Sequence, residues 1–163
     1  MKTSSGGPTT GRIEDGQHIL PLRIYYEDTD AQGIVYYANW LRFLERGRTE
    51  LLRMLGLEHS ALRADSGISW VVRRCTIDYL MPARLDETID IVTGCGEMRG
   101  ASLDMIQEAR RGDDLLVRAE LLIACMGERG RPARLPRTGP QRAADGCPHR
   151  GVAPLTPYSD IRL

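Results

Sequence analysis

Apolar residues along the chain recur with two different periods, and each period predicts a different element. Between residues 39 and 55 they recur at helical spacing, with charged residues at most of the other positions. This pattern predicts one long amphipathic helix, which Gly56 would end. The apolar face of this helix is expected to consist of Leu41, Leu44, Leu51, Leu52 and Leu55.

Gly47 is an unfavourable residue inside this predicted helix, because glycine costs about 1 kcal/mol relative to alanine in a helix interior. We therefore expect another backbone to approach the helix closely here, as when a sheet wraps around it. Arg46 and Glu50 stand four residues apart and are expected to pair on the helix surface. Glu45 also has arginines within helical reach, so we expect both glutamates to lie on the solvated face or to form structural pairs.

After residue 66 the period changes to two, the spacing typical of β-strands. The strands predicted in this way, together with one before the helix, cover residues 18–26, 67–79, 85–95, 101–110 and 115–126. Gly112 and Asp113 suit a hairpin turn between the last two. A short helix is predicted over residues 58–65. One long helix against one antiparallel sheet is an α+β fold.

The composition changes at both ends of the chain. Residues 1–17 are rich in glycine, serine, threonine and charge, and are expected to form a flexible leader. Residues 137–163 form a Pro- and Arg-rich tail that is expected to be disordered. This leaves one folded domain over residues 18–136. Since the first 20 residues contain no long apolar run, we expect no signal peptide, no transmembrane segment and a cytoplasmic location.

Charge and cysteine spacing exclude two classes of function. The formal net charge of zero argues against a dedicated nucleic-acid-binding protein. The four cysteines contain no CxxC pair, and the three histidines stand far apart. The sequence therefore predicts no zinc site.

Three acidic residues, Glu27, Asp28 and Asp30, stand close together shortly before the predicted helix, and Gly33 follows them. Free backbone N–H groups at a helix start favour developing negative charge. A carboxylate beside such an amide is what an acyl-transfer site needs. The segment is thus the candidate active site.

The acidic residues of this segment have two other interpretations. The spacing of Asp28, Asp30 and Gly33 resembles the start of an EF-hand calcium loop, but its twelfth position is Asn39 where a glutamate is required. A calcium site is therefore rejected. Asp30 could also be a simple turn or N-cap residue, because aspartate is favoured at both places. Asp28 is assigned that structural role.

The ordered motifs of this region resemble the 4-hydroxybenzoyl-CoA thioesterase-like family, and most closely its YbgC-like, Tol–Pal-associated subgroup. The resemblance rests on YEDTDAQGIVYYANWL over residues 26–41, ERGRTE over 45–50 and IDYLMPARLD over 77–86. It implies the hotdog fold, in which a curled antiparallel sheet, here of about five strands, wraps a long central helix.

The resemblance also implies a site. Asp30 would act as nucleophile or as general base, and the two routes stay open. The backbone amide near Tyr37 would donate to the oxyanion, and Gly33, Tyr36 and Tyr37 would contact the substrate. Many members of the subgroup place a histidine where this chain has Tyr37. A tyrosine cannot act as a base near neutral pH, because its ordinary pKa is about 10.

The activity implied is hydrolysis of an acyl-CoA thioester to a free acid and coenzyme A, without metal or organic cofactor, coenzyme A being part of the substrate. The family resemblance implies a homo-oligomer, a dimer or tetramer, with sites formed between subunits. The sequence leaves open whether an acyl carrier protein is a partner. The alternatives are a hotdog hydratase or dehydratase, which would need a histidine near Asp30, and a non-enzymatic binding or scaffold protein.

Overall fold

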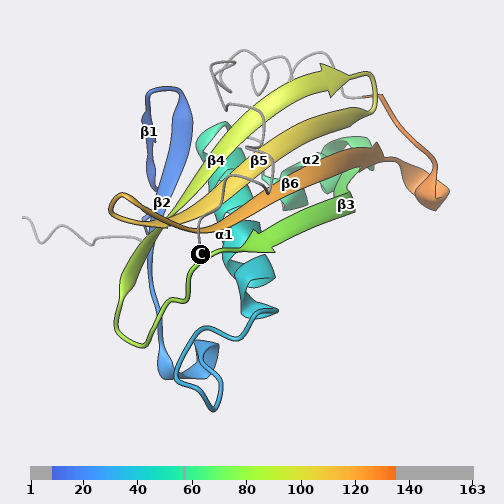
Figure 1. Ribbon diagram of the computed structural model, residues 1–163. Helices are drawn as coiled ribbons and strands as arrows, with labels where there is room; N and C mark the ends of the chain where they lie inside the picture. The colour runs from blue at the N-terminus through green and yellow to red at the C-terminus, as the bar shows by residue number, and fades with distance from the viewer. Residues whose placement is uncertain (1–8, 57, 135–163) are drawn as a thin grey trace, which may run out of the picture.

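The computed structural model describes residues 9–56 and 58–134 of the chain. A long helix, α1 (Asn39–Met54), lies in the hollow of a curled antiparallel sheet (Figure 1). Strands β2, β4 and β5 all contact this helix. The helix-in-sheet arrangement confirms the predicted α+β class and the hotdog fold.

The sheet has six strands, against the five or so that the sequence predicts. Their order in space is β1-β2-β4-β5-β6-β3, and every neighbouring pair is antiparallel. Their bounds are Arg12–Glu14, Gln17–Arg23, Ser69–Tyr79, Thr88–Arg99, Ser102–Arg111 and Asp114–Met126 for β1 to β6. The strand β3 pairs with β6 and lies at one edge, so the strands after the helix do not form a simple meander.

The extra strand corrects the prediction of a flexible leader for residues 12–17. Strand β1 pairs with the start of β2, and Ile13 lies opposite His18. The buried His18 ring also makes a 2.7 Å hydrogen bond between its Nε2 and the carbonyl oxygen of Thr10. These contacts hold the hairpin to the sheet. The first eight residues and the predicted tail, residues 137–163, lie outside the described residues.

Shorter elements connect the strands and the helix. The 3-10 turn η1 (Tyr26–Asp28) follows β2, so the strand predicted over residues 18–26 ends earlier, at Arg23. The second helix, α2 (His59–Ser66), precedes β3, and the 3-10 turn η2 (Glu128–Gly130) follows β6. Among the described residues, neither helix combines the length and apolar character needed to span a membrane.

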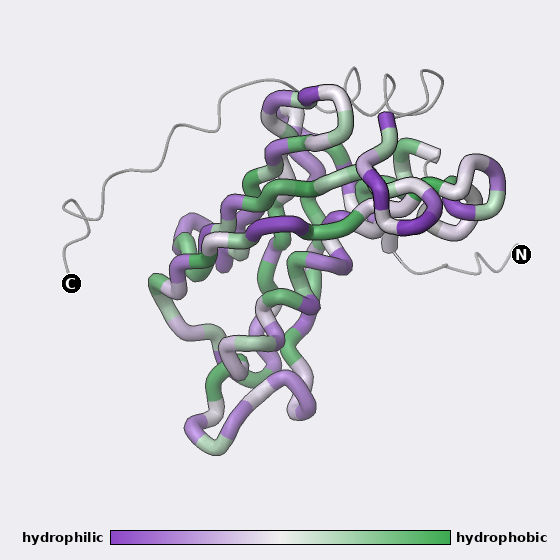
Figure 2. The backbone as a smooth tube through the Cα atoms, turned by 90° about the vertical axis from the view of Figure 1, so that its right-hand side faces the viewer, coloured by the Kyte–Doolittle hydropathy of each residue, from purple (hydrophilic) through white to green (hydrophobic). Residues whose placement is uncertain are grey.

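The buried face of α1 differs from the predicted one at its start. Leu41 is 46% exposed, whereas Trp40 and Phe43 are buried. The buried residues of the helix begin at Trp40 and recur every three or four positions. One of them is charged. They are Trp40, Phe43, Leu44, Gly47, Arg48 and Leu51. Apolar segments, green in Figure 2, run along the helix and the strands that enclose it.

Gly47 is the point where α1 approaches the sheet most tightly. A Cβ atom at this position would lie 2.7 Å from Ile91 Cγ2 and 3.2 Å from both Gln107 Nε2 and Thr93 Oγ1. These atoms belong to side chains of β4 and β5. The expectation of a close approach at Gly47 is therefore confirmed, although side chains rather than backbone make the contact.

The loop between β3 and β4 supports the segment before α1. The amide of Val35 donates to the carbonyl oxygen of Ala83 over 2.9 Å, and Ile34 forms an antiparallel bridge with Arg84. Glu87 fixes the end of this loop: its Oε2 accepts hydrogen bonds from the Arg84 amide at 2.9 Å and from Arg111 Nη1 at 2.8 Å.

Burial alone would raise the pKa of Glu87, but the hydrogen bonds from the Arg84 amide and Arg111 and the positive charges of Arg111 and Arg84 outweigh it, so its pKa is lowered. The folded state thus favours the ionised carboxylate. This contribution to stability is present above the unfolded-state pKa, about 4.3, and is lost as the pH falls through the folded-state pKa.

Substituting Gly47→Ala tests the close packing of α1. The added methyl must displace Ile91, and overpacking of this kind costs about 1–3 kcal/mol, which exceeds the gain of about 1 kcal/mol in helix propensity. Urea denaturation should show a lower free energy of unfolding. In an Ile91→Ala background, which removes the opposing methyl, the penalty should shrink. A Gly47→Ala protein as stable as the unmodified chain would contradict this account.

Substituting Glu87→Gln tests the contacts through which Glu87 fixes the end of the loop between β3 and β4. Thermal unfolding at pH 7 should show a lower melting temperature, because the free energy of unfolding falls by about 0.5–1 kcal/mol. The difference should shrink as the pH falls through the lowered pKa of Glu87, because the wild-type carboxylate then becomes protonated. The matched control is Glu97→Gln, which removes an exposed partner of Arg99 and should leave the melting temperature unchanged over the same pH range.

Candidate active site

The acid turn is tied to the start of α1 through Asp28. The buried Asp28 carboxylate accepts a hydrogen bond from the Tyr25 amide, at 2.9 Å from Oδ2. Its carbonyl oxygen accepts two more, from the Tyr36 amide at 2.9 Å and from Asn39 Nδ2 at 3.0 Å. Asp28 thus shapes the turn, as the sequence predicts, and fixes its position against the first residue of the helix.

Asp30 lies at the tip of this turn. Its Oδ1 accepts a hydrogen bond from the Gln32 amide at 2.8 Å, and its carbonyl oxygen accepts one from the Gly33 amide at 2.9 Å. Gly33 has a φ of 73°, which reverses the chain and which glycine adopts without strain. Among the described residues no donor contacts Asp30 Oδ2. Asp30 is therefore a turn residue whose half-buried carboxylate keeps one oxygen available.

The helix start offers amides beside this turn. The N-cap residue of α1 is Ala38, which has no side-chain cap, so Asp30 is not the N-cap. The Tyr36 amide donates to the Asp28 carbonyl oxygen of the turn, and the Asn39 amide donates to the Tyr36 carbonyl oxygen. Within the described part of the chain, the Tyr37 amide between them donates to no acceptor. This is the amide that the sequence analysis selects as an oxyanion donor.

Three tyrosines surround the helix start. The rings of Tyr36 and Tyr37 meet edge to face with centroids 4.9 Å apart, and those of Tyr37 and Tyr79 with centroids 6.1 Å apart. The Tyr79 hydroxyl donates to the Tyr37 carbonyl oxygen at 3.2 Å. Tyr79, at the end of β3, is not among the site residues predicted from the sequence, although it lies in the motif over residues 77–86.

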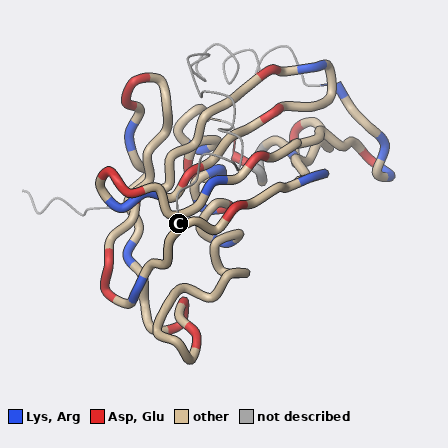
Figure 3. Tube along the Cα trace, in the orientation of Figure 1, with Lys and Arg blue, Asp and Glu red and all other residues tan. Residues whose placement is uncertain are grey.

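The negative charge of Asp30 affects the pKa of a tyrosine in this cluster. Hydrogen bonding to the Tyr37 side chain and the charge of that group raise the pKa of Tyr36, and burial and the negative charge of Asp30 raise it further. Asp30 and Tyr36 thus lie within electrostatic range of each other. Figure 3 shows the acidic segment, residues 27–30, on the loop at the lower end of the molecule. A carboxylate and a free amide therefore share one end of α1.

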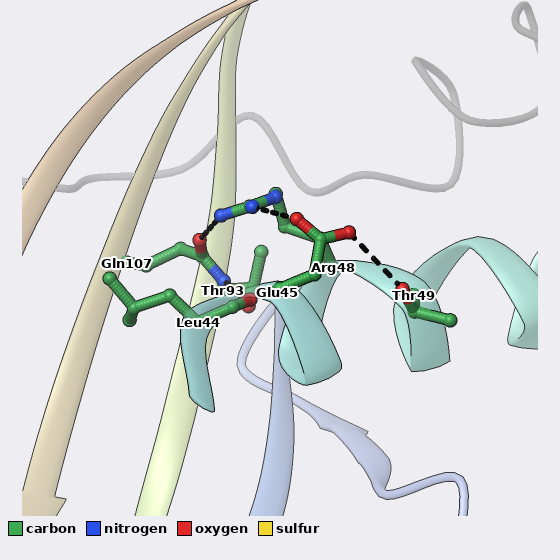
Figure 4. Close-up of polar contacts among 6 residues, drawn as sticks. All are labelled: Leu44, Glu45, Arg48, Thr49, Thr93 and Gln107. Carbon is green, nitrogen blue, oxygen red and sulfur yellow. Dashed lines mark hydrogen bonds and ion pairs between the residues drawn. The ribbon is translucent and has the colours of Figure 1, made fainter. Parts of the chain in front are cut away.

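Further along α1, a buried arginine links the helix to the sheet (Figure 4). Arg48 Nη1 donates to Gln107 Oε1 at 2.7 Å, and its Nη2 pairs with Glu45. Gln107 Nε2 in turn donates to the Leu44 carbonyl oxygen and to Thr93 Oγ1, both at 2.9 Å. The structural role expected of Glu45 is confirmed. Arg48 is an exception to the expectation that the charged residues of the helix lie outside its buried face, and the local pattern could not reveal this because Gln107 lies 59 residues away.

Glu50 also has a structural partner, but it is Arg53 rather than the predicted Arg46. The Arg46 guanidinium instead lies 5.9 Å from the centroid of the Phe43 ring. A cation over an aromatic face is attracted by the ring quadrupole. The two helix glutamates are thus engaged in ion pairs, which leaves Asp30 as the carboxylate best placed for chemistry at the helix start.

A cavity of about 90 Å³ lies beside the C-terminal half of α1. Glu45 and Arg48 line it, and the rest of its lining is largely apolar. Leucines of the helix and of the residue after it, together with residues of β3, β4, β5 and β6, form this lining; they include Leu51, Leu52, Leu55, Trp70, Cys95, Met105 and Ile123. The cavity is therefore distant, along α1, from the turn that carries Asp30.

Coenzyme A carries phosphates, and five arginines on the strands and turns have the charge to face them: Arg73, Arg74, Arg99, Arg110 and Arg111. Three of them form ion pairs: Arg99 with Glu97 and Asp104, Arg110 with Glu108, and Arg111 with Glu87 and Asp114. Arg73 and Arg74 are exposed on β3, and no carboxylate pairs with them within the described ranges. No group of three or more His, Cys, Asp or Glu side chains in those ranges is placed to hold a metal ion.

The sequence matches the Thioesterase-like superfamily over residues 25–144. It is 42% identical over 120 residues to the acyl-CoA thioester hydrolase YbgC of Escherichia coli, a match that covers 72% of this chain and 89% of that protein. It is 38% identical over 112 residues to the acyl-CoA thioesterase YbgC of Haemophilus influenzae, covering 69% of this chain and 82% of that protein.

Solved structures agree with this assignment. A probable thioesterase from Bartonella henselae superposes with a TM-score of 0.71 at 37% identity, covering 74% of this chain and 99% of that chain. A 1,4-dihydroxy-2-naphthoyl-CoA thioesterase from Synechocystis superposes with a TM-score of 0.72 at 18% identity, covering 81% and 96%, and shows the shared fold alone. The chain is therefore a thioester hydrolase that belongs to the Thioesterase-like superfamily and, within it, to the YbgC-like group.

Proposed function

We propose that this enzyme hydrolyses acyl-CoA thioesters, with Asp30 as the reacting carboxylate and the Tyr37 amide as the oxyanion donor. The observation that carries the proposal is the acid turn itself. Asp28 ties the turn to the helix start, which brings the available oxygen of Asp30 and the free amide of Tyr37 to the same end of α1. The similarity to acyl-CoA thioesterases supports acyl-CoA as the substrate.

The thioester carbonyl oxygen would accept a hydrogen bond from the Tyr37 amide. The helix dipole adds the equivalent of about half a positive charge there, and one such donor is worth about 3 kcal/mol in the transition state. Asp30 would take a proton from a water molecule whose oxygen bonds to the carbonyl carbon. The C–S bond then breaks, and the coenzyme A thiolate leaves and takes up a proton.

The second route has the same outcome. Asp30 bonds directly to the carbonyl carbon and displaces the thiolate, giving a mixed anhydride that water then hydrolyses. In both routes Gly33, Tyr36 and Tyr37 would contact the substrate, since they flank the reacting groups. Tyr37 would act through its backbone amide and not as a base, because a phenol is protonated near neutral pH.

The rival functions have weaker support. A hydratase needs a histidine beside the acid, but His18 lies in the β1–β2 hairpin, is buried and bonds to Thr10. A binding or scaffold protein would not need an available carboxylate oxygen beside a free amide. Acyl carrier protein could present the same thioester as coenzyme A. We favour coenzyme A, which the names of the relatives indicate, and a cytoplasmic location.

Substituting Asp30→Asn should lower kcat/KM for acyl-CoA hydrolysis by about 10²–10⁴-fold, the usual contribution of a positioned acid or base. The amide can still accept the turn hydrogen bond from Gln32, so the fold should be kept. Release of free thiol over a panel of acyl-CoAs measures the rate. Full activity in a folded Asp30→Asn protein would overturn the proposed mechanism.

Two controls accompany this experiment. Glu27→Gln removes an exposed carboxylate three residues away and should leave the rate unchanged. Tyr37→Phe keeps the backbone amide, so it should lower the rate by less than about tenfold, whereas loss of a true oxyanion donor costs about 10²–10³-fold. A larger loss would indicate that the Tyr37 hydroxyl, rather than its amide, takes part in the reaction.

We also propose that the enzyme is a homo-oligomer built on a dimer through β3. This strand of eleven residues lies at the edge of the sheet and pairs only with β6 among the described strands. Its free edge can pair with another strand. Val72 and Tyr79 are 44% and 46% exposed on it, so a second copy of β3 would cover apolar surface as well as backbone groups.

Substituting Val72→Lys should weaken this dimer, because charged residues on an edge strand oppose pairing. Sedimentation velocity should show dimers or tetramers for the unmodified protein and a shift toward monomers for the variant. The matched control is Ile13→Lys at the opposite edge, on β1, where a similarly exposed residue is replaced. Monomers for the unmodified protein at all concentrations would exclude the dimer.

A further inference from the structure

A hollow of about 510 Å³ lies on the outer face of the sheet, the face turned away from α1. Along β6, Leu121 and Ile123 belong to the same buried core as residues of the helix, whereas Leu122 and Ala124 are only half-buried. Successive side chains of a strand point to opposite faces, so these two point outward. Val71 of β3 pairs with Ala124 and lies on the same face. The floor of the hollow is therefore largely apolar.

The segment after β6 forms one wall of this hollow. It folds back on the strand: the Ala133 amide donates to the Cys125 carbonyl oxygen over 2.9 Å, and Met126 forms an antiparallel bridge with Pro132. Gly130 and Pro132 therefore line the hollow beside Met126. In Figure 1 this segment, in orange, lies at the right-hand end of the molecule, whereas the acid turn lies at the lower end. The hollow is thus separate from the candidate active site.

Arg73 brings a positive charge to the hollow. Among the described residues that line it, no other is charged. Its neighbours on the strand, Val72 and Arg74, pair with consecutive residues of β6, so Arg73 is the extra residue of a β-bulge. Bulges redirect a side chain and are common beside functional sites. Arg73 is exposed, and no carboxylate within the described ranges pairs with it. Its guanidinium is therefore available to an anion.

The border of the hollow is also positive. The wall segment and the residue after it carry Arg129, Arg131 and Arg134, all exposed, against the single acid Glu128. In the described part of the chain, none of these three arginines pairs with a carboxylate. Figure 3 shows basic positions on β3 and after β6 at this end of the sheet. An apolar floor with a positive border favours an anionic ligand that has an apolar body.

We propose that this hollow is a second binding site, which takes a carboxylic acid with an unbranched aliphatic chain. The chain would cover Val71, Leu122 and Ala124, and the carboxylate would pair with Arg73. A planar guanidinium binds a carboxylate through two parallel N–H···O bonds. One lining cation also balances the single charge of a carboxylate, whereas a phosphate monoester carries nearly two. The volume lies within the range of about 300–1,000 Å³ that is typical of small-molecule sites.

The inference goes beyond the proposed function and does not depend on it. Arg73 precedes Tyr79 on β3 by about 20 Å, at 3.3 Å per residue. A ligand in the hollow therefore leaves the groups at the helix start uncovered. The dimer that we propose through β3 also leaves the outer face open, because edge pairing covers backbone groups rather than a face of the sheet. Acid binding and thioester hydrolysis can thus be measured separately.

The first experiment measures the binding of decanoate to the full chain by isothermal titration calorimetry, with decylammonium as the comparison ligand of equal chain length. Decanoate should bind at least about tenfold more tightly, because Arg73 attracts one head group and repels the other. Substituting Arg73→Glu should reverse this preference. The matched control, Arg74→Glu, makes the same change in net charge outside the lining and should keep the preference. Equal losses in both variants would indicate attraction by diffuse charge and would overturn the site.

The second experiment fills the hollow. Ala124→Trp places a large side chain on its floor and should abolish decanoate binding, while the rate of acyl-CoA hydrolysis stays unchanged. The control is Ile106→Trp, at a half-buried position of β5 outside the lining, which should change neither quantity. Circular dichroism checks that each variant is folded. Decanoate binding that persists in a folded Ala124→Trp protein would place the acid in another cavity and would overturn the proposal.

The outcomes separate this inference from the proposed function. If Asp30→Asn keeps the full hydrolytic rate, the proposed role of Asp30 is wrong, but decanoate should still bind to that protein with the wild-type affinity. If Asp30→Asn is inactive and decanoate binds to neither protein, only the second site is wrong. Hexanoate provides a check on the apolar floor: it should bind more weakly than decanoate, by up to about fourfold for each missing methylene. Equal affinities for the two acids would contradict burial of the chain.

Discussion

The contact between α1 and the sheet at Gly47 is the constraint on which the rest of the structure depends. Only a residue without a side chain leaves room for Ile91, because a Cβ atom at position 47 would lie 2.7 Å from Ile91 Cγ2. That closeness allows Gln107 to reach the Leu44 carbonyl oxygen and the Arg48 guanidinium at once. Removing one partner of such a buried group leaves an unsatisfied donor or acceptor, at a cost of about 1–3 kcal/mol. The network therefore fixes where the helix lies along the sheet.

The position of the helix in turn fixes the position of the acid turn. The acid turn is bonded to Asn39, the first residue of α1, and so moves with the helix. On its other side the turn region is bonded to the loop after β3, through Val35 and Ala83. Asp30 is thus held between two supports that both belong to the rigid body of the domain. The role that we propose for Asp30 requires such support, because small displacements reduce the rate of a positioned reaction.

Local sequence patterns predicted the helices and strands well. They failed where contacts between residues far apart in the sequence determine the structure. The glycine at position 47 and the cap-like role of Asp28 follow from rules that act within a few residues. The pairing of β3 with β6 does not, since periodicity identifies a buried face but not the neighbouring strand. Arg48 was misplaced for the same reason: a charged residue is buried only when a partner such as Gln107 arrives from another element. Strand β1 is only three residues long and all three are exposed, so its alternation of polar and apolar residues is too short to predict a strand.

Tyr79 belongs both to the edge strand and to the tyrosine cluster, so it connects that edge to the helix start. Its hydroxyl donates to the Tyr37 carbonyl oxygen, while its backbone lies at the end of the strand through which we propose the dimer forms. A change at that edge would therefore reach Tyr37, whose amide we propose as the oxyanion donor. In the proposed dimer, dilution below its dissociation constant would uncover this edge by mass action. The amount of protein in the cell would then set what fraction of the chains has its tyrosine cluster covered by a second copy.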